Sequence, residues 1–210
     1  MNRCTLLVAW ALLSAFVLPA AAQTPRIEKG ALVRFHSPSL GDSGAKVEIV
    51  EFFDPACEGC AAFYPFVKRL LDEHRGRVRL KIRYLPFHKG ADQIVKLLEA
   101  ARRQGKYIET LDILIANQAQ WAIHHTARLD LALKVVGPVG LQMEKLKVDM
   151  AAPELAQLIE QDIKDAVALD IDRTPTFFVN GKPLTKLGYK ELQAMVQQAL
   201  RESYGAPDTK

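Results

Sequence analysis

The pattern of apolar and polar positions predicts strands in the first half of the chain. Residues 45–54 (AKVEIVEFFD) are mostly apolar and rich in Val, Ile and Phe, as in a buried central strand. Residues 78–85 (VRLKIRYL) alternate apolar and basic side chains, which predicts a second strand with one solvated basic face. A shorter run, ALVRF at 31–35, predicts a further short strand before a stretch of turn formers. The basic positions in and beside the second strand are Arg75, Arg77, Arg79, Lys81 and Arg83.

Apolar residues at helical spacing occupy much of the remaining chain. A helix is expected from about Cys57 to His74, with a kink at Pro65. Between about residues 90 and 170, three apolar stripes predict a block of helices, which VVGPVG at 135–140 interrupts. The stripes are Ile94, Leu97, Leu98 and Ala101; Leu111, Leu114 and Ile115; and Leu155, Leu158, Ile159, Ile163 and Val167.

The end of the chain returns to strands. Residues 174–184 (TPTFFVNGKPL) read as two short strands around an Asn180-Gly181 turn, a pair that favours a tight hairpin. The order of elements is therefore strand, helix, strand, several helices, hairpin and helix. This order describes one α/β sheet covered on both faces, with residues 90–170 as a helical insertion. The last helix carries Leu192, Met195, Val196, Ala199 and Leu200 on one face.

The first residues follow neither pattern. Arg3 precedes an apolar run from about Thr5 to Leu18, and PAAAQ follows that run. A basic start, an apolar centre and small residues at the end are typical of a secretory signal peptide. We expect residues 1–22 to be cleaved after Ala22, leaving one domain over residues 23–210. An uncleaved anchor is the rival interpretation, but the run is short for a membrane span.

Export changes the cysteine count. Cys4 lies within the expected signal peptide, so the mature chain keeps only Cys57 and Cys60. A short signal of this type fits a bacterial periplasm, where paired thiols tend to form disulfides.

Composition excludes little else. The chain has 210 residues, of which 49% are hydrophobic and 25% charged, as in an ordinary globular protein with a sizeable core. The formal net charge is only +4, and the basic strand lacks interleaved aromatics, so nucleic-acid binding is not expected.

Cys57 and Cys60 form a C-x-x-C motif at the predicted start of a helix. Covalent haem attachment requires a histidine directly after the motif, where this chain has Ala61. A structural zinc site requires further Cys or His ligands at regular spacing, and a static disulfide across so short a loop stabilises little. Two hypotheses remain: thiol–disulfide exchange, which requires neither cofactor nor metal, and binding of a soft ion such as Cu(I).

The position of the motif favours exchange. A cysteine at a helix N-terminus faces unsatisfied backbone amides, which stabilise a thiolate and lower its pKa. Cys57 is therefore the expected nucleophile. Cys60, one turn later and expected to be more buried, is the expected resolving thiol.

Three segments carry a family resemblance. VEIVEFFDPACEGCAAFYP at 47–65 resembles the active-site region of DsbA-like thiol:disulfide oxidoreductases of the thioredoxin superfamily, and HSPSLGDSGAKVEIVEF at 36–52 resembles its lead-in. RTPTFFVNGKPL at 173–184 resembles the cis-proline loop and following hairpin of that family. The resemblance implies a thioredoxin fold with an inserted helical subdomain. It also implies a periplasmic enzyme that exchanges disulfides with exported proteins.

The resemblance assigns roles to further residues. Pro175 matches the cis-proline beside the cysteines, and Thr174 would offer backbone groups to an extended substrate. Glu51 matches a buried carboxylate that helps to move the proton of Cys60. An acid within the apolar run VEIVEFF also fits that role physically, because burial should raise its pKa.

Other residues depart from the family or have ordinary interpretations. Glu58 and Gly59 stand between the cysteines where strongly oxidising members often carry Pro and His, and a carboxylate there should disfavour the thiolate. We therefore expect a milder oxidant. His88, after the second strand, is expected in a solvated loop, with a place near the active-site surface as the alternative. The pair His124-His125 beside Trp121 is expected at an ordinary helix end, with a site for copper or another metal as the alternative.

Partners and direction follow from the resemblance only in outline. Oxidation of substrates would require a membrane redox partner to reoxidise the cysteines, whereas reduction or isomerisation would require an electron donor. The sequence does not choose between these directions. Residues 23–44 are too short for the dimerisation domain of isomerase-type relatives, so a monomer is expected.

Overall fold

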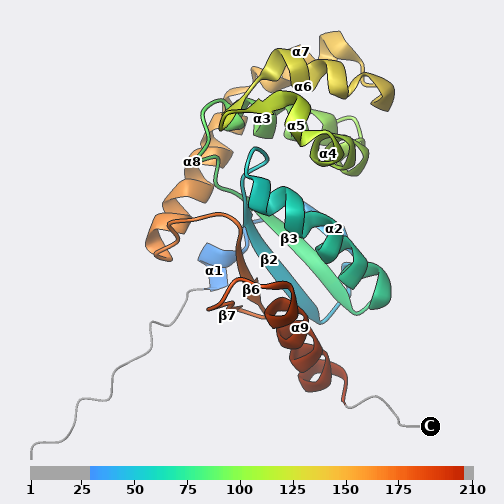
Figure 1. Ribbon diagram of the computed structural model, residues 1–210, viewed down its shortest axis with the longest axis vertical. Coiled ribbons are helices and arrows are strands. Elements are labelled where there is room, and N and C mark those ends of the chain that lie inside the picture. Colours follow the sequence, from blue (N-terminus) through green and yellow to red (C-terminus); the bar gives the residue numbers. More distant parts are fainter. Residues whose placement is uncertain (1–28, 206–210) are drawn as a thin grey trace, which may run out of the picture.

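The computed structural model describes residues 29–205 (Figure 1). The expected signal peptide, residues 1–22, lies outside this range. Within it, no helix is both long enough and apolar enough to span a membrane.

A mixed sheet forms the centre of the described region. Its strands lie in the order β1-β3-β2-β6-β7. The central strand β2 pairs in parallel with β3 and antiparallel with β6. Both faces of β2 are covered, which explains its nearly continuous apolar sequence. The strands are β1 (Ser39–Gly41), β2 (Val47–Phe53), β3 (Val78–Tyr84), β6 (Thr176–Val179) and β7 (Lys182–Pro183).

Helices cover both faces of this sheet. Helices α2 (Glu58–Glu73) and α9 (Tyr189–Tyr204) pack on one face, while α1 (Lys29–Leu32) and α8 (Pro153–Ala168) meet on the other. Figure 1 shows the helices between β3 and β6 gathered above one end of the sheet, with α8 running back along its side. These are α3 (Ala91–Arg102), α4 (Tyr107–Ala116), α5 (Gln118–Trp121), α6 (Leu129–Val135), a 3₁₀ turn (Gly137–Val139) and α7 (Met143–Met150).

Alternate residues of β2 divide the core into two clusters. Val47, Ile49 and Phe53 face the large cluster formed with α2, α9 and the helical insertion. Val50 and Phe52 face a smaller cluster beneath α1 and α8. The predicted fold class, an α/β thioredoxin fold with a helical insertion, is thus the observed architecture.

The predicted strand at 31–35 is wrong. Ala31 and Leu32 belong to helix α1, and Ser39–Gly41 instead pairs with the edge of β3. A run of only five residues is too short for its hydrophobic periodicity to distinguish a strand from a helical turn. Burial of Leu32 in the smaller cluster and a hydrogen bond from Arg83 to the Ala31 carbonyl oxygen fix the turn.

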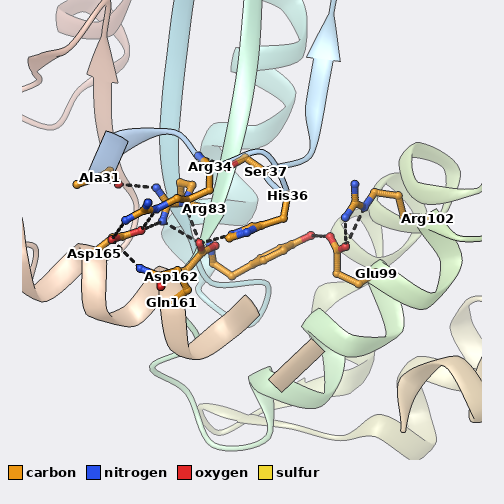
Figure 2. A network of polar contacts seen from close by, with 11 residues as sticks. Ala31, Arg34, His36, Ser37, Arg83, Glu99, Arg102, Gln161, Asp162 and Asp165 are labelled. Atoms are coloured by element: carbon orange, nitrogen blue, oxygen red, sulfur yellow. Dashed lines mark hydrogen bonds and ion pairs between the residues drawn. The ribbon is translucent and has the colours of Figure 1, made fainter. Parts of the chain in front are cut away.

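The predicted basic face of β3 and the predicted inner face of α8 are each wrong in part. Arg83 is 0% exposed, and its guanidinium contacts Asp162 and Asp165 of α8 (Figure 2). Helix α8 therefore turns its aspartates inward, while Val167 is 74% exposed and Ile163 is also exposed. A buried guanidinium without a paired carboxylate would cost more free energy than leaving Ile163 and Val167 exposed. Helix α8 is therefore oriented by its aspartates rather than by its apolar stripe.

The N-terminal segment completes this ion-pair network (Figure 2). Arg34 donates two hydrogen bonds to Asp165, at 2.7 and 2.6 Å, and the His36 ring lies 2.7 Å from Asp162. Although burial acts in the opposite direction, hydrogen bonds from Arg34 and Arg83 lower the pKa of Asp165. The network joins helix α8 of the insertion to strand β3 of the sheet.

His124 and His125 do not end a helix. Helix α5 ends at Trp121, and two short strands, β4 (Ala122–Ile123) and β5 (Thr126–Ala127), pair around the two histidines. Both histidines have positive φ, 47° and 58°, as in the tight turns of hairpins whose loop contains only two residues. That turn usually contains Asn or Gly, so the sequence carried no hairpin signal here.

Candidate active site

Cys57 and Cys60 lie where β2 meets helix α2. The loop after Phe53 leads into the helix, Cys57 is the N-cap residue, and Cys60 falls in the first turn. Both are free thiols, and Cys60 is fully buried. The Cys57 thiol donates to the carbonyl oxygen of Thr174, 3.3 Å away.

The two thiols have opposite acidities. The hydrogen bond from Cys60 is the largest influence that lowers the pKa of Cys57, to about 5, and it outweighs the effect of burial. Backbone amides of Gly59 and Cys60 at the helix N-terminus act in the same direction. Burial raises the pKa of Cys60 well above its ordinary value. The two thiols thus differ in acidity in the direction that an attacking and a resolving thiol require, and these two roles stay predictions.

Glu51 lies on β2 on the same side as Ile49 and Phe53, facing the large core cluster. It is 0% exposed, and neither carboxyl oxygen has a hydrogen-bond partner among the described residues. Burial, assisted by the nearby charge of Cys57, raises its pKa well above the ordinary 4.5. Burial and the Cys57 side chain raise the pKa of Cys60, and the charge of Glu51 adds to this shift.

The loop before β6 faces the cysteines. The Thr174–Pro175 peptide bond is cis, as the family resemblance implied. Gly59 allows this loop to come close, because a Cβ at position 59 would lie 3.0 Å from Cδ of Pro175 and 3.5 Å from Sγ of Cys57. Gly59 was singled out only as a departure between the cysteines, and its steric role depends on contacts that the sequence does not show.

Asp54 and His88 belong to the site, although sequence reasoning missed the first and placed the second in a solvated loop. The fully buried Asp54 carboxylate accepts hydrogen bonds from the Ala56 amide, the His88 amide and the His88 ring, at 2.8, 2.9 and 2.7 Å. An Asp-Pro pair directly after a strand is a turn signal that could have marked Asp54. The solvated interpretation of His88 is wrong because Asp54 draws its ring against the active-site loop.

Gln118 of α5 is a second residue that sequence reasoning missed. Its buried side-chain amide donates to the carbonyl oxygens of Pro55 and Cys57, at 2.8 and 3.0 Å. These bonds fasten the helical insertion to the loop that carries the nucleophile. No sequence signal marks such a contact, because 61 positions separate Gln118 from Cys57.

A sheet with this order, a C-x-x-C motif at the start of a helix and a cis-proline beside it define a thioredoxin-fold protein. Residues 35–198 match the family model described as Thioredoxin, and the chain therefore belongs to the thioredoxin family. A solved thioredoxin-like oxidoreductase from Silicibacter pomeroyi DSS-3 is 30% identical with a TM-score of 0.72. This comparison covers 83% of this chain and 98% of that one. The predicted resemblance is confirmed at the level of family and fold.

Curated relatives differ in overall length. A probable disulfide bond formation protein D from Bacillus cereus is 25% identical over 176 residues, which is 78% of this chain and 79% of that protein. The Na(+)/H(+) antiporter NhaA from Herminiimonas arsenicoxydans is 28% identical over 144 residues, which is 69% of this chain but only 22% of the antiporter. The chain thus matches only about a fifth of the length of the antiporter, but most of the length of the Bacillus cereus protein.

Proposed function

We propose that the protein is an enzyme that exchanges disulfides with other proteins through Cys57 and Cys60. The difference in pKa between the two thiols carries this proposal. The lowered pKa of Cys57 favours its thiolate near neutral pH, whereas the raised pKa of Cys60 favours its protonated form. Family membership and the thioredoxin-like oxidoreductase of similar structure support it.

The oxidising direction is the one we propose. A substrate thiolate attacks Sγ of Cys57 in the oxidised protein, so that the Cys57–Cys60 bond breaks and Cys60 leaves with the electron pair and takes up a proton. A second substrate thiolate then attacks the substrate sulfur of the mixed disulfide and releases Cys57 as a thiolate. The substrate loses two electrons and the protein gains them. Stabilisation of the Cys57 thiolate favours the reduced protein and thus oxidation of the substrate.

Glu51 is proposed as the group that exchanges a proton with Cys60. Burial raises its pKa and so favours its protonated form, which can give a proton to the departing Cys60 and take it back when Cys60 attacks.

Substrate is proposed to lie extended beside the loop of Thr174 and Pro175. The Thr174 carbonyl oxygen already faces Sγ of Cys57, which places a backbone acceptor next to the reacting sulfur. Gly59 allows the Pro175 ring to lie against the start of helix α2 and so keeps the loop next to Cys57. Thr174 would then pair with the substrate backbone, while Pro175 presents no amide to compete.

We further propose a periplasmic location, exported proteins as substrates, a membrane redox partner and a monomeric state. The expected signal peptide supports export. An oxidant must be reoxidised after each turnover, and the proposed membrane redox partner would accept the two electrons.

A mixed-disulfide trap tests the proposal. In Cys60→Ala, the Cys57 thiolate can attack the disulfide of an oxidised substrate protein, so that one substrate sulfur bonds to Cys57 and the other leaves as a thiolate. Cys60 is then absent and cannot release the substrate by attack on Cys57, so the mixed disulfide should persist and be visible on a non-reducing gel. Cys57→Ser should trap nothing, and only the unsubstituted protein should oxidise a dithiol peptide. Binding of Cu(I) by the unsubstituted protein without any dithiol oxidation would contradict the proposal and support the alternative of a copper-binding module.

A further inference from the structure

Asp54 connects the active-site loop with the buried cysteine. Its carbonyl oxygen accepts the Cys57 amide at 3.1 Å, and its carboxylate accepts the Ala56 amide at 2.8 Å. Its own amide donates to Sγ of Cys60 at 3.5 Å. One residue thus orients both the turn before the nucleophile and a hydrogen-bond donor at the second sulfur.

His88 also holds the Asp54 carboxylate in place. Both its backbone amide and its ring nitrogen Nδ1 bond to Oδ2 of Asp54. The ring stacks on His125, with centroids 5.7 Å apart and planes at 20°. The Ala127 amide donates to the Lys89 carbonyl oxygen at 2.8 Å, which joins this loop to the hairpin of the insertion. The position of Asp54 therefore depends on the sheet, on the β3–α3 loop and on the insertion.

We propose that Asp54 is a positioning residue that aims its backbone amide at Cys60 whenever that sulfur carries negative charge, and that His88 holds Asp54 in place. This inference rests on the proposed thiol–disulfide exchange and assigns residues to its second step. It goes beyond Glu51, which acts on the proton, because Asp54 acts on the charge of the sulfur.

The chemistry requires such a donor. Burial, Cys57 and Glu51 raise the pKa of Cys60, and the Asp54 amide acts in the opposite direction. In the oxidising direction Cys60 leaves as a thiolate, and in the reverse direction it must attack as one. A hydrogen bond to the charged sulfur lowers the barrier in both directions, because it is stronger to the thiolate than to the thiol.

Oxidised glutathione separates the two steps in the reduced protein. First, the Cys57 thiolate attacks one glutathione sulfur, forms a mixed disulfide and releases one glutathione thiolate. Second, the Cys60 thiolate attacks Sγ of Cys57, the internal disulfide forms, and the second glutathione leaves as a thiolate that takes up a proton. Acid quenching and mass spectrometry give the amounts of reduced, glutathionylated and internally oxidised protein over time.

The variants distinguish a positioning role from a general structural one. Asp54→Ala should slow the second step about tenfold, as expected for loss of one hydrogen bond to a charged group. The first step, which loses only the support of the Ala56 amide, should slow much less. His88→Ala should slow the second step in the same direction. His88→Asn, whose amide nitrogen replaces Nδ1, should restore it, whereas His88→Gln, whose amide lies further out, should not. His124→Ala, at the adjacent turn position, is the matched control and should behave as the unsubstituted protein.

Several results would overturn the inference. Equal slowing of both steps in the Asp54 and His88 variants would show a general disturbance of the site, and unchanged second steps would show no role. If Asp54→Ala does not fold, the comparison of His88→Asn with His88→Gln decides, and equal rates for these two contradict the proposal. Absence of any mixed disulfide in the unsubstituted protein would instead contradict the proposed function itself.

Discussion

Sγ of Cys57 lies 3.3 Å from the carbonyl oxygen of Thr174, although 117 positions separate the two residues in the chain. Strands β2 and β6 pair antiparallel, and Phe52 lies opposite Thr176 at the end where both segments reach the active site. The start of helix α2 and the loop before β6 are thus brought together by the sheet. The predictions below test the chemistry of this junction and the contacts that support it.

The acidity of Cys57 predicts the pH dependence of its alkylation. The thiolate becomes the main form only above its pKa, so the rate with iodoacetamide should rise around pH 5 and be nearly constant from about pH 7 upward. Cys60→Ala removes the hydrogen bond that most lowers this pKa, and its midpoint should move to higher pH. A midpoint near 9, the ordinary value for cysteine, would contradict the proposed nucleophile.

Replacement of the unpartnered carboxyl of Glu51 should stabilise the protein. At pH 7 the unfolded chain ionises Glu51 freely, whereas burial in the folded protein disfavours that charge. We expect Glu51→Leu to raise the free energy of unfolding in urea by about 1–3 kcal/mol, and to slow exchange through loss of the proton carrier.

The sign of the pH dependence provides the control for Glu51. A raised folded pKa means that the folded protein binds more protons than the unfolded chain between pH 4.5 and that raised value, so stability falls as pH rises through this window. The advantage of Glu51→Leu should therefore be smaller at pH 4 than at pH 7. An advantage that does not change with pH would indicate packing rather than desolvation of the carboxylate.

Arg83 should dominate the stability of the ion-pair network. Removal of its charge leaves Asp162 and Asp165 buried with weaker compensation, and we expect Arg83→Met to lower the free energy of unfolding by about 3–5 kcal/mol. Lys81→Met, at a half-buried position on the same strand, should change it by less than about 1 kcal/mol. Equal losses in urea unfolding would mean that charge on β3 matters irrespective of burial.

Replacement of Gln118 should lower activity more than it lowers stability, because its side chain contacts the loop that carries Cys57. Gln118→Leu leaves the carbonyl oxygens of Pro55 and Cys57 without this donor, which should loosen the loop and lower dithiol oxidation severalfold. The loss of stability should be only about 1 kcal/mol, the contribution of an ordinary hydrogen bond. Gln120→Leu, an exposed position on the same helix, is the control, and a similar loss of activity there would contradict a role for the two bonds.

Glu58 should limit the oxidising strength of the pair. It is the first residue of α2, directly after Cys57, and a carboxylate there opposes the thiolate that the helix amides stabilise. Glu58→Gln should therefore shift the equilibrium with glutathione toward the reduced protein. Equilibration at several glutathione ratios measures this shift, and an unchanged midpoint would show that solvent screens Glu58 from Cys57.

The sequence alone determined the elements whose signals are local. An apolar β-rich run predicted β2, and Asn180-Gly181 predicted the hairpin at which φ is positive for both residues. The C-x-x-C motif predicted the start of α2 and the unequal surroundings of its thiols, because a helix N-terminus has the same chemistry in any fold. The catalytic roles of Cys57, Cys60 and Glu51 stay predictions until they are measured.

Only the tertiary structure decided which long-range neighbours each side chain meets. It buried Arg83 against α8, turned the apolar stripe of that helix partly outward, and drew His88 and Gln118 onto the active-site loop. Periodicity shows which residues share a face of one element but not which element that face meets. Buried charges and donors are paired only when distant elements pack together. The contacts of His88 with Asp54, of Gln118 with Cys57 and of Arg83 with Asp165 span 34, 61 and 82 positions of the chain.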